Sequence, residues 1–401
     1  MKKMGPGLLV MAAFIGPGTV TTASSAGANF GFALLWALLF AVMATLVLQE
    51  MSARLGLVSG QGLAEALRTS FRNPFFSRLS IILVVAAIGF GNAAYESGNI
   101  SGASLALQGV TDIPRGIWAV VVALIAGSLL ASGRYQVVES ALVALVAVMS
   151  VVFVVTMMLV KPDLGDLFSG LLRPSLPDGS ALTIMALIGT TVVPYNLFLH
   201  ASSVRQKWSE NVPLETALKE SRQDTRFAIS LGGLITLAIV STAAAAFFGT
   251  GVAFSASSLS IQLQPLLGDY AGWFFASGLF AAGLTSAVTS PLAAAYAVCG
   301  ALGWPVDMTE RRFKAIWIAV LTAGAVVAAL GARPIAAIMF AQASNGFLLP
   351  LVAVFLLVVM NRRDLLGQYC NTWRSNLLGG LVIAIVLMLS GVKLAQVVGL
   401  V

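Results

Sequence analysis

The sequence predicts an all-α integral membrane protein with about eleven transmembrane helices, in which two five-helix halves of opposite orientation precede a last helix. Of its 401 residues, 58% are hydrophobic and 10% are charged, which lies outside the composition of soluble globular proteins. Apolar stretches of about 20 residues recur along the chain. The first and the sixth of them are interrupted by glycine and proline in corresponding positions, which is typical of inverted repeats.

Hydropathy windows place the individual spans. The first half covers residues 6–30, 33–53, 79–108, 115–133 and 137–160, the second half covers 181–204, 227–249, 271–302, 314–331 and 334–360, and the eleventh span covers 376–398. We expect a single transmembrane domain over 1–401, with repeats at about 6–160 and 181–360. The first stretch lacks a convincing cleavage site after a short core, so we expect it to be retained as a span rather than removed as a signal peptide.

Positive charges predict the orientation, because loops rich in Lys and Arg resist translocation. With a cytoplasmic N-terminus, all but five of the 23 Lys and Arg residues lie inside. The five outside are Arg115, Lys161, Arg173, Arg333 and Lys393. We therefore expect a multi-pass protein of the inner (cytoplasmic) membrane with its C-terminus outside, whose net charge of +7 reflects topology rather than nucleic-acid binding.

The loops exclude several classes of function. The longest, near 55–78, 161–180 and 205–226, are each about 20 residues, too short for an extramembrane domain. The spans contain no Ser/His/Asp set, no HExxH motif and no carboxylate cluster. The two cysteines form neither a disulfide framework nor a metal cluster. We expect no enzyme and no cofactor, with the lipid bilayer and a small ion or solute as partners of a monomer.

Two interrupted spans are the main pointer to a site. The first reads "IGPGTVTT", with Pro17 between two glycines, and the sixth reads "IGTTVVPYN", in which Gly189 and Pro194 bracket two threonines and two valines at mid-span. Proline removes an N–H and disrupts the preceding turn, so both helices should unwind there. Carbonyls from about Ala12 to Phe14 and Leu187 to Thr190, and N–H groups near Gly18 to Thr21 and Asn196 to Phe198, would then be free. Unwound backbone in a membrane is tolerated where it lines a cavity or is packed in protein.

Polar side chains of the third span suggest a coupling group. Asn92, Glu96 and Asn99 form one helical stripe, and Glu96 is the one carboxylate deep in a span. Such a residue is a candidate proton carrier or cation ligand, and the alternative is a neutral acid bonded to a neighbouring helix. In the sixth span, Asn196 and His200 share a face, so His200 either continues a proton path or is structural.

Two further spans carry polar pairs at helical spacing. Gln342 and Asn345 lie three residues apart in the tenth span and share a face. Thr285 and Thr289 lie four apart in the eighth span, where we favour hydroxyls that bond back to their own helix.

The sequence resembles the Nramp family of proton-coupled divalent-metal transporters. The likeness spans nearly the whole chain and is carried by residues 16–68, by "GTTVVPYNLFLHASSVRQ" and by "AQASNGFLLPL". It implies the LeuT-type fold, with broken helices 1 and 6 and an eleventh helix.

Departures from the family pattern occur at the breaks. The usual Asp-Pro-Gly-Asn is Gly16-Pro17-Gly18-Thr19 here, and the usual Met-Pro-His is Val193-Pro194-Tyr195. Glu96 matches a proton-linked aspartate, Asn99 an acidic residue, His200 a histidine and Gln342 a glutamine that closes over the metal. Together the resemblance and the breaks predict a substrate site formed by Ala13, Gly16, Gly18, Thr19, Thr190, Val193, Tyr195, Gln342 and Asn345. They also predict a proton pathway formed by Glu96, Asn99 and His200.

These departures leave three hypotheses, because a dehydrated divalent cation in low dielectric needs an anionic ligand. The sequence offers no strong set of metal ligands, and at most Thr19 and Glu96 could bind a metal ion. The first hypothesis is proton-linked transport of a hard or partly hydrated divalent ion such as magnesium or manganese. The second is transport of a small polar non-metal solute or anion, which the N–H groups near Gly18 and Thr19 would bind. The third is a sensor or scaffold, which usually carries an added soluble domain.

Overall fold

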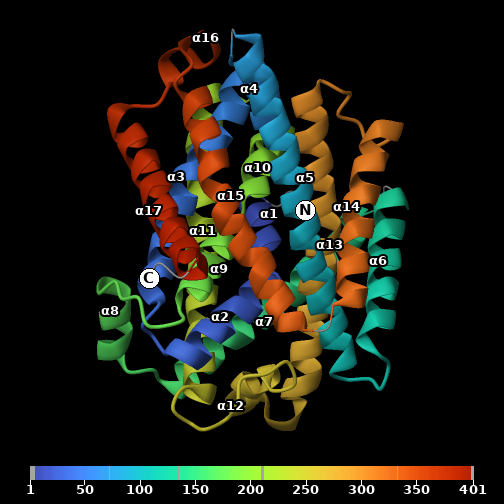
Figure 1. The fold of residues 1–401 in the computed structure, drawn as a ribbon, viewed down its shortest axis with the longest axis vertical. Helices are drawn as coiled ribbons and strands as arrows, with labels where there is room; N and C mark the ends of the chain where they lie inside the picture. Colours follow the sequence, from blue (N-terminus) through green and yellow to red (C-terminus); the bar gives the residue numbers. More distant parts are fainter. Residues whose placement is uncertain (1–4, 72, 133–134, 209–211, 332, 399–401) are drawn as a thin grey trace.

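The chain folds into a bundle of helices around two broken central spans (Figure 1). The computed structural model describes residues 5–71, 73–132, 135–208, 212–331 and 333–398. Within these ranges all regular secondary structure is helical. The membrane-crossing helices of the first half are α1 (Pro6–Phe14) with α2 (Pro17–Phe30), α3 (Leu35–Ser59), α5 (Pro74–Gln108), α6 (Arg115–Ser132) and α7 (Tyr135–Val160).

The second half repeats this order. It consists of α9 (Ala181–Thr191) with α10 (Pro194–Lys207), α11 (Leu214–Phe247), α13 (Ala271–Leu302), α14 (Arg311–Leu330) and α15 (Pro334–Met360), and α17 (Trp373–Val398) follows it. Shorter helices lie in the connections, namely α4 (Leu63–Arg68), α8 (Leu164–Leu172), α12 (Gln264–Leu267) and α16 (Arg363–Leu366).

The observed spans agree with the hydropathy prediction. In the described part of the chain, ten helical segments are long and apolar enough to cross a membrane. The first span adds an eleventh, because its division at Gly16 leaves two helices of 9 and 14 residues that are each too short alone. The sixth span is divided in the same place, so both predicted interruptions are present in the structure.

The loop prediction was wrong for residues 205–226. Here α10 continues to Lys207, and α11 begins at Leu214, ahead of the apolar part that hydropathy detects. The early turns of α11 carry charged side chains that extend beyond the apolar region. One of them, Asp224, accepts a hydrogen bond of 2.7 Å from the backbone N–H of Gly7 in the first turn of α1. The N-terminal end of α1 is therefore fastened to α11.

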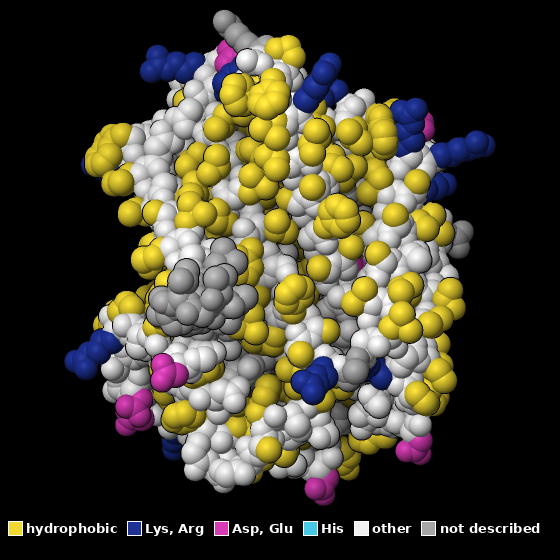
Figure 2. All heavy atoms as spheres, viewed as in Figure 1, with side chains coloured by type: hydrophobic (Ala, Val, Ile, Leu, Met, Phe, Trp, Pro, Cys, Tyr) yellow, Lys and Arg dark blue, Asp and Glu magenta, His cyan; other side chains and the backbone are white. Residues whose placement is uncertain are grey.

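Burial separates the centre of the bundle from its rim. In the apolar stretch of the α9–α10 span, 94% of the residues are buried inside the protein, whereas in α6 the share is 22%. Figure 2 shows apolar side chains over the middle of the molecule and Lys and Arg gathered at the end where α4 and α16 lie. Arg54, at the end of α3, pairs there with Glu50 at 3.3 Å and donates to the carbonyl of Tyr369 at 3.1 Å. The sixth span thus lies in the most enclosed part of the fold, and α2 of the first span is buried from Pro17 to Ala28.

Candidate functional site

The two breaks share one backbone path. At the first, α1 ends at Phe14, Ile15 turns away with φ −80° and ψ 77°, and Gly16 is extended before Pro17 starts α2. At the second, Val192 has φ −99° and ψ 73°, and Val193 is extended before Pro194 starts α10. Proline favours the first helical position because its φ is preset and its missing N–H would be unpaired there. Two non-helical residues followed by proline therefore build both interruptions.

The non-helical residues at the first break change the hydrogen bonding of the carbonyls at the end of α1. Pro17 has no N–H to offer the carbonyl of Ala13, and the N–H of Gly16 turns to Phe14 instead, at 3.0 Å. The Phe14 carbonyl also accepts from the Thr19 hydroxyl. The expectation of free groups is therefore wrong for the Phe14 carbonyl. It is also wrong at the second break, where the Ile188 carbonyl accepts from the Val192 N–H at 2.8 Å, the Leu187 carbonyl accepts from the Thr191 hydroxyl at 2.9 Å, and the Asn196 N–H donates to Val193. The side chain of Ala13 lies outside the described residues, although its backbone belongs to α1.

A hydrogen bond joins the two breaks. Thr19 of α2 and Thr190 of α9 are both fully buried, and their hydroxyl oxygens lie 2.8 Å apart. These two predicted residues come from opposite halves of the chain, 171 positions apart. The broken helices therefore meet directly at the centre of the bundle.

The glycines of the first break allow close approach by two other helices. A methyl group on Gly16 would lie 2.8 Å from the hydroxyl oxygen of Ser286 in α13. A methyl group on Gly18 would overlap the side-chain amide of Gln342 in α15. The space that a longer side chain would need at either position is therefore held by a polar group from a neighbouring helix. The sequence reading did not single out Ser286.

Gln342 and Asn345 bring amide groups to this region. Gln342 is fully buried, and neither its Nε2 nor its Oε1 has a hydrogen-bond partner. Asn345 is 2% exposed, and its Nδ2 is also unpaired. Asn196, in the first turn of α10, has both side-chain polar atoms buried and unpaired. Buried polar groups normally have partners, so these amides are suited to receive a polar ligand or water.

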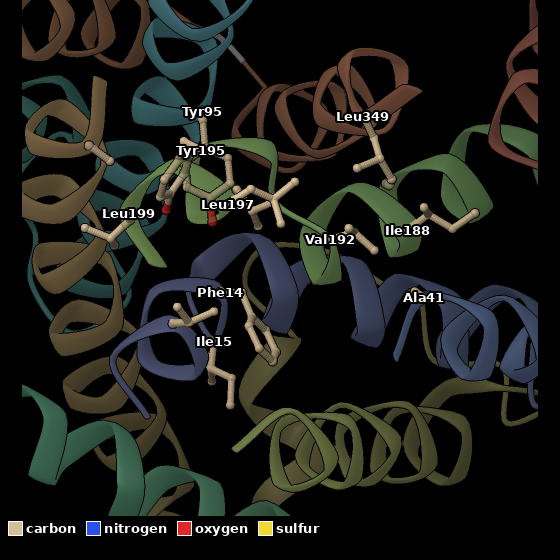
Figure 3. Packing of buried hydrophobic residues seen from close by; sticks show 14 of the residues in the cluster. Phe14, Ile15, Ala41, Tyr95, Ile188, Val192, Tyr195, Leu197, Leu199 and Leu349 are labelled. Atoms are coloured by element: carbon tan, nitrogen blue, oxygen red, sulfur yellow. The ribbon is translucent and has the colours of Figure 1, made fainter. Parts of the chain in front are cut away.

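An aromatic pair lies beside the second break. Tyr195, the second residue of α10, packs edge-to-face against Tyr95 of α5, with ring centroids 5.3 Å apart (Figure 3). Both side chains are fully buried. Val193, between the pair and the end of α9, is 1% exposed. Sequence reasoning identified Tyr195 but missed Tyr95, whose signal was a tyrosine one residue before Glu96 on the small-residue face of α5.

Glu96 lies between Asn99 and α14. Its Oε2 accepts a hydrogen bond of 3.2 Å from Nδ2 of Asn99, and its Oε1 is buried without a partner. Its side chain packs on α14, where a methyl group on Gly324 would lie 2.6 Å from its Cγ. Asn92, earlier on the stripe, donates to the Ser290 carbonyl of α13 at 3.0 Å. The stripe therefore faces α13 and α14.

His200 has a neighbour on α3. Its Nδ1 lies 2.8 Å from Oε1 of Gln49, and its Nε2 is buried and unpaired. On α13, the Thr289 hydroxyl bonds back to the Thr285 carbonyl at 3.1 Å, as expected, but the Thr285 hydroxyl has no partner. Among the described residues, no group of three His, Cys, Asp or Glu side chains could hold a metal ion. The breaks therefore offer neutral oxygens and amides.

Comparisons with known proteins agree on one family. The family described as "Natural resistance-associated macrophage protein-like", abbreviated Nramp, matches residues 7–396. A protein of Yersinia pestis named "Divalent metal cation transporter MntH" is 31% identical over 395 residues, covering 96% of this chain and 93% of its own. The protein of the same name from Deinococcus radiodurans is 30% identical, covering 99% of this chain and 90% of its own.

Solved structures show the same fold. The Eremococcus coleocola manganese transporter superposes with a TM-score of 0.78 at 22% identity, covering 98% of this chain and 86% of that one. Mhp1, a nucleobase-cation-symport-1 family transporter, superposes with a TM-score of 0.59 at 17% identity, over 97% and 90% of the two chains. These matches confirm the all-helical fold of the LeuT type with broken first and sixth spans.

Proposed function

Because the chain belongs to the Nramp family, we propose that it is a secondary transporter that carries a divalent cation across the inner membrane through its two helix breaks. One observation carries the proposal. Thr19 and Thr190 join the broken spans at the most buried place in the fold, where transporters of inverted-repeat architecture bind their cargo. The gathering of Lys and Arg at the α4 end supports a cytoplasmic N-terminus and an external C-terminus.

The available ligands favour a hard ion that keeps part of its water shell. Hydroxyl, carbonyl and amide oxygens suit magnesium and manganese, whereas the thioether that soft metals prefer is absent at Val193. Without a carboxylate at Gly16, full dehydration of a divalent ion would be too costly. The unpaired amides of Gln342 and Asn345 could instead bind the ion through its retained water.

We assign the proton-linked role to Glu96, with Asn99 and His200 on the pathway. Glu96 is fully buried and has one unpaired oxygen. Because its side chain packs on α14, its charge would act on the breaks through α5 and not by contact with the cargo. Buried acidic groups inside membrane bundles commonly carry protons.

The test is uptake of manganese, magnesium and a panel of small polar solutes into proteoliposomes, with internal pH recorded. We expect divalent uptake with acidification in the wild type, and uptake without its pH dependence in Glu96→Gln. Glu96→Asp should retain part of the coupling. Asp112→Asn, a change of an exposed residue outside the bundle, is the control. Unchanged uptake and unchanged pH dependence in Glu96→Gln would contradict the proton-linked role of Glu96.

A second function is favoured by the unpaired amides themselves. Gln342 and Asn196 each present a donor and an acceptor, which a small polar organic solute or anion could engage as well as a hydrated ion. Uptake of such a solute without divalent transport in the same panel would select this function.

A further inference from the structure

We propose that a cavity beside α8, at the end of the bundle opposite the Lys- and Arg-rich α4 end, binds the headgroup of phosphatidylethanolamine. The inference goes beyond the transport proposal, because it concerns a membrane lipid held at the rim of the fold and not the cargo at the breaks. It rests on the charges around the cavity, the backbone at Lys161 and the exposed apolar stripe of α8.

The cavity lies where the ends of three membrane-crossing helices meet α8. Its volume is about 680 Å³, and it is lined by residues at the ends of α2, α7 and α11 and by one side of α8. A methyl group on Gly170 would lie 2.1 Å from the carbonyl oxygen of Phe32, so α8 packs closely on the connection after α2. The Ser175 hydroxyl donates to the Ala33 carbonyl at 3.0 Å. These contacts fix α8 as one wall of the cavity.

Two cationic and two acidic side chains line this cavity. They are Lys161, Asp163, Asp166 and Arg173, and all four are exposed. Among the described residues, none of the four belongs to an ion pair. Figure 2 shows charges of both signs close together at the corner where Figure 1 places α8. The cavity therefore presents separated charges of both signs whose sum is zero.

The backbone at Lys161 is held in an unfavourable conformation. Its φ is 46°, and in the described part of the chain it is the one residue other than glycine with a positive φ. Glycine and asparagine adopt this region most readily, so local conformation alone would favour one of them here. Strained positions of this kind are concentrated at binding sites. The lysine is therefore better explained by the use of its charge at the cavity than by the turn.

An apolar stripe on α8 places the cavity at the level of the lipid headgroups. Leu164, Phe168 and Leu172 lie four residues apart on one face and are 65%, 56% and 72% exposed. The cavity is lined from another side of the same helix, by Asp166 and the residues one turn and two turns later. A short helix with one exposed apolar face and one charged face is suited to lie in the membrane interface.

The pattern of charge selects the class of lipid. A phosphodiester accepts charge-assisted hydrogen bonds from lysine and arginine, and arginine can bind it through two N–H groups. A primary ammonium offers three N–H donors to the two carboxylates. Phosphatidylglycerol has no ammonium and would bring its negative charge beside Asp163 and Asp166. The quaternary ammonium of phosphatidylcholine has no N–H to donate. Phosphatidylethanolamine carries both required groups.

The experiment measures thermal unfolding of the purified, delipidated full chain in detergent. Palmitoyl-oleoyl phosphatidylethanolamine, phosphatidylglycerol or phosphatidylcholine is added at equal concentration. We expect phosphatidylethanolamine to raise the unfolding temperature by about 3 °C at a hundredfold excess over its Kd, and the other two lipids to raise it by at most about 1 °C. Glycerophosphoethanolamine, which is the headgroup without acyl chains, should give no shift, because the micelle no longer concentrates it beside α8.

Two charge variants test the residues. Lys161→Gln/Arg173→Gln should lose most of the shift with phosphatidylethanolamine, because the phosphate loses both cations. Asp163→Asn/Asp166→Asn should instead prefer phosphatidylglycerol, because two cations remain without carboxylates. Asn caps a helix as well as Asp does, so the Asp163 side chain, which accepts from the Asp166 N–H at 2.9 Å, can still cap α8.

The matched controls are Arg333→Gln and Asp178→Asn, which change exposed residues outside the cavity and should leave the lipid preference unaltered. Equal shifts with all three lipids would overturn the proposal, and so would an unaltered preference in both charge variants. A full shift with glycerophosphoethanolamine would identify a soluble solute and contradict the lipid. Because this assay does not measure uptake, its failure leaves the transport proposal standing, and failed uptake leaves this site untouched.

Discussion

The two helix breaks have the same backbone and different surroundings. Each has two non-helical residues before a proline that starts the next helix. At the first break the flanking residues are Gly16, Gly18 and Thr19, so side chains from α13 and α15 reach the backbone. At the second, Val193 and Tyr195 fill the space themselves. Proline placement thus sets the shape of a break, and the residues beside the proline set its chemistry.

The contrast extends to the partners of each break. The first break faces neutral polar groups, the hydroxyl of Ser286 and the amide of Gln342. The second faces the ring of Tyr95 through Tyr195. Polar ligands are therefore concentrated on the first break, and the second supplies mainly packing and the hydroxyl of Thr190. Substitutions on either side can test this division.

The largest effect is expected from restoring charge at the first break. Gly16→Asp with Thr19→Asn places a carboxylate and an amide where the wild type has neither. A missing charged partner costs about 3 kcal/mol or more, so manganese affinity should rise at least about a hundredfold over a weak wild-type value. Isothermal titration of the purified protein measures it.

The matched control for that variant is Gly16→Asn with Thr19→Asn, which has nearly the same shape and no charge. It should bind manganese as weakly as the wild type. Equal affinity in the two double variants, or micromolar binding by the wild type, would show that charge at Gly16 is not what limits metal binding.

A smaller effect is expected at the second break. In the Gly16→Asp/Thr19→Asn background, Val193→Met adds a thioether and should raise cadmium affinity relative to magnesium by roughly tenfold, because soft ligands favour soft metals. In the wild-type background the same change should have no effect on metal binding. Val193→Leu, which lacks the sulfur, is the control. A cadmium preference in Val193→Met alone would mean that the second break binds metal without the first.

The smallest effect concerns the contact between the breaks. Thr190→Val removes the hydrogen bond to Thr19 and should lower the free energy of unfolding by about 1 kcal/mol, seen as a drop of about 1 °C in the unfolding temperature. Thr191→Val is the matched control, since that buried hydroxyl bonds to Leu187 of its own helix at 2.9 Å. Equal losses in the two variants would indicate that the Thr19–Thr190 contact contributes nothing specific.

The spans and the interruptions could be predicted from the sequence because both depend on local signals. Hydropathy over about 20 residues locates a span, and a proline with a glycine in the same span locates a break, without knowledge of the neighbours. Hydropathy did not predict the early start of α11, because the first turns of this helix are helical but carry charged residues. Hydropathy reports where a helix is apolar and not where it begins.

The direction of individual side chains could not be predicted in the same way. Glu96 and Tyr95 are adjacent, yet one packs on α14 and the other on Tyr195. A helical stripe identifies residues that share a face, but tertiary packing decides which neighbour that face meets. For the same reason the sequence could not identify Ser286 as part of the site, because its position beside Gly16, 270 residues away, depends on tertiary packing.

The hydrogen bond between Asp224 and the Gly7 N–H restrains rotation of α1 about its inner end. With nine residues, α1 is about 13 Å long, is fastened to α11 at its outer end and ends at the non-helical Ile15–Gly16 joint. A rotation of about 20° at that joint would swing the fastened end by roughly 5 Å, which exceeds the reach of a hydrogen bond. Such a rotation of α1 therefore requires that the Asp224 carboxylate on α11 first release the Gly7 N–H.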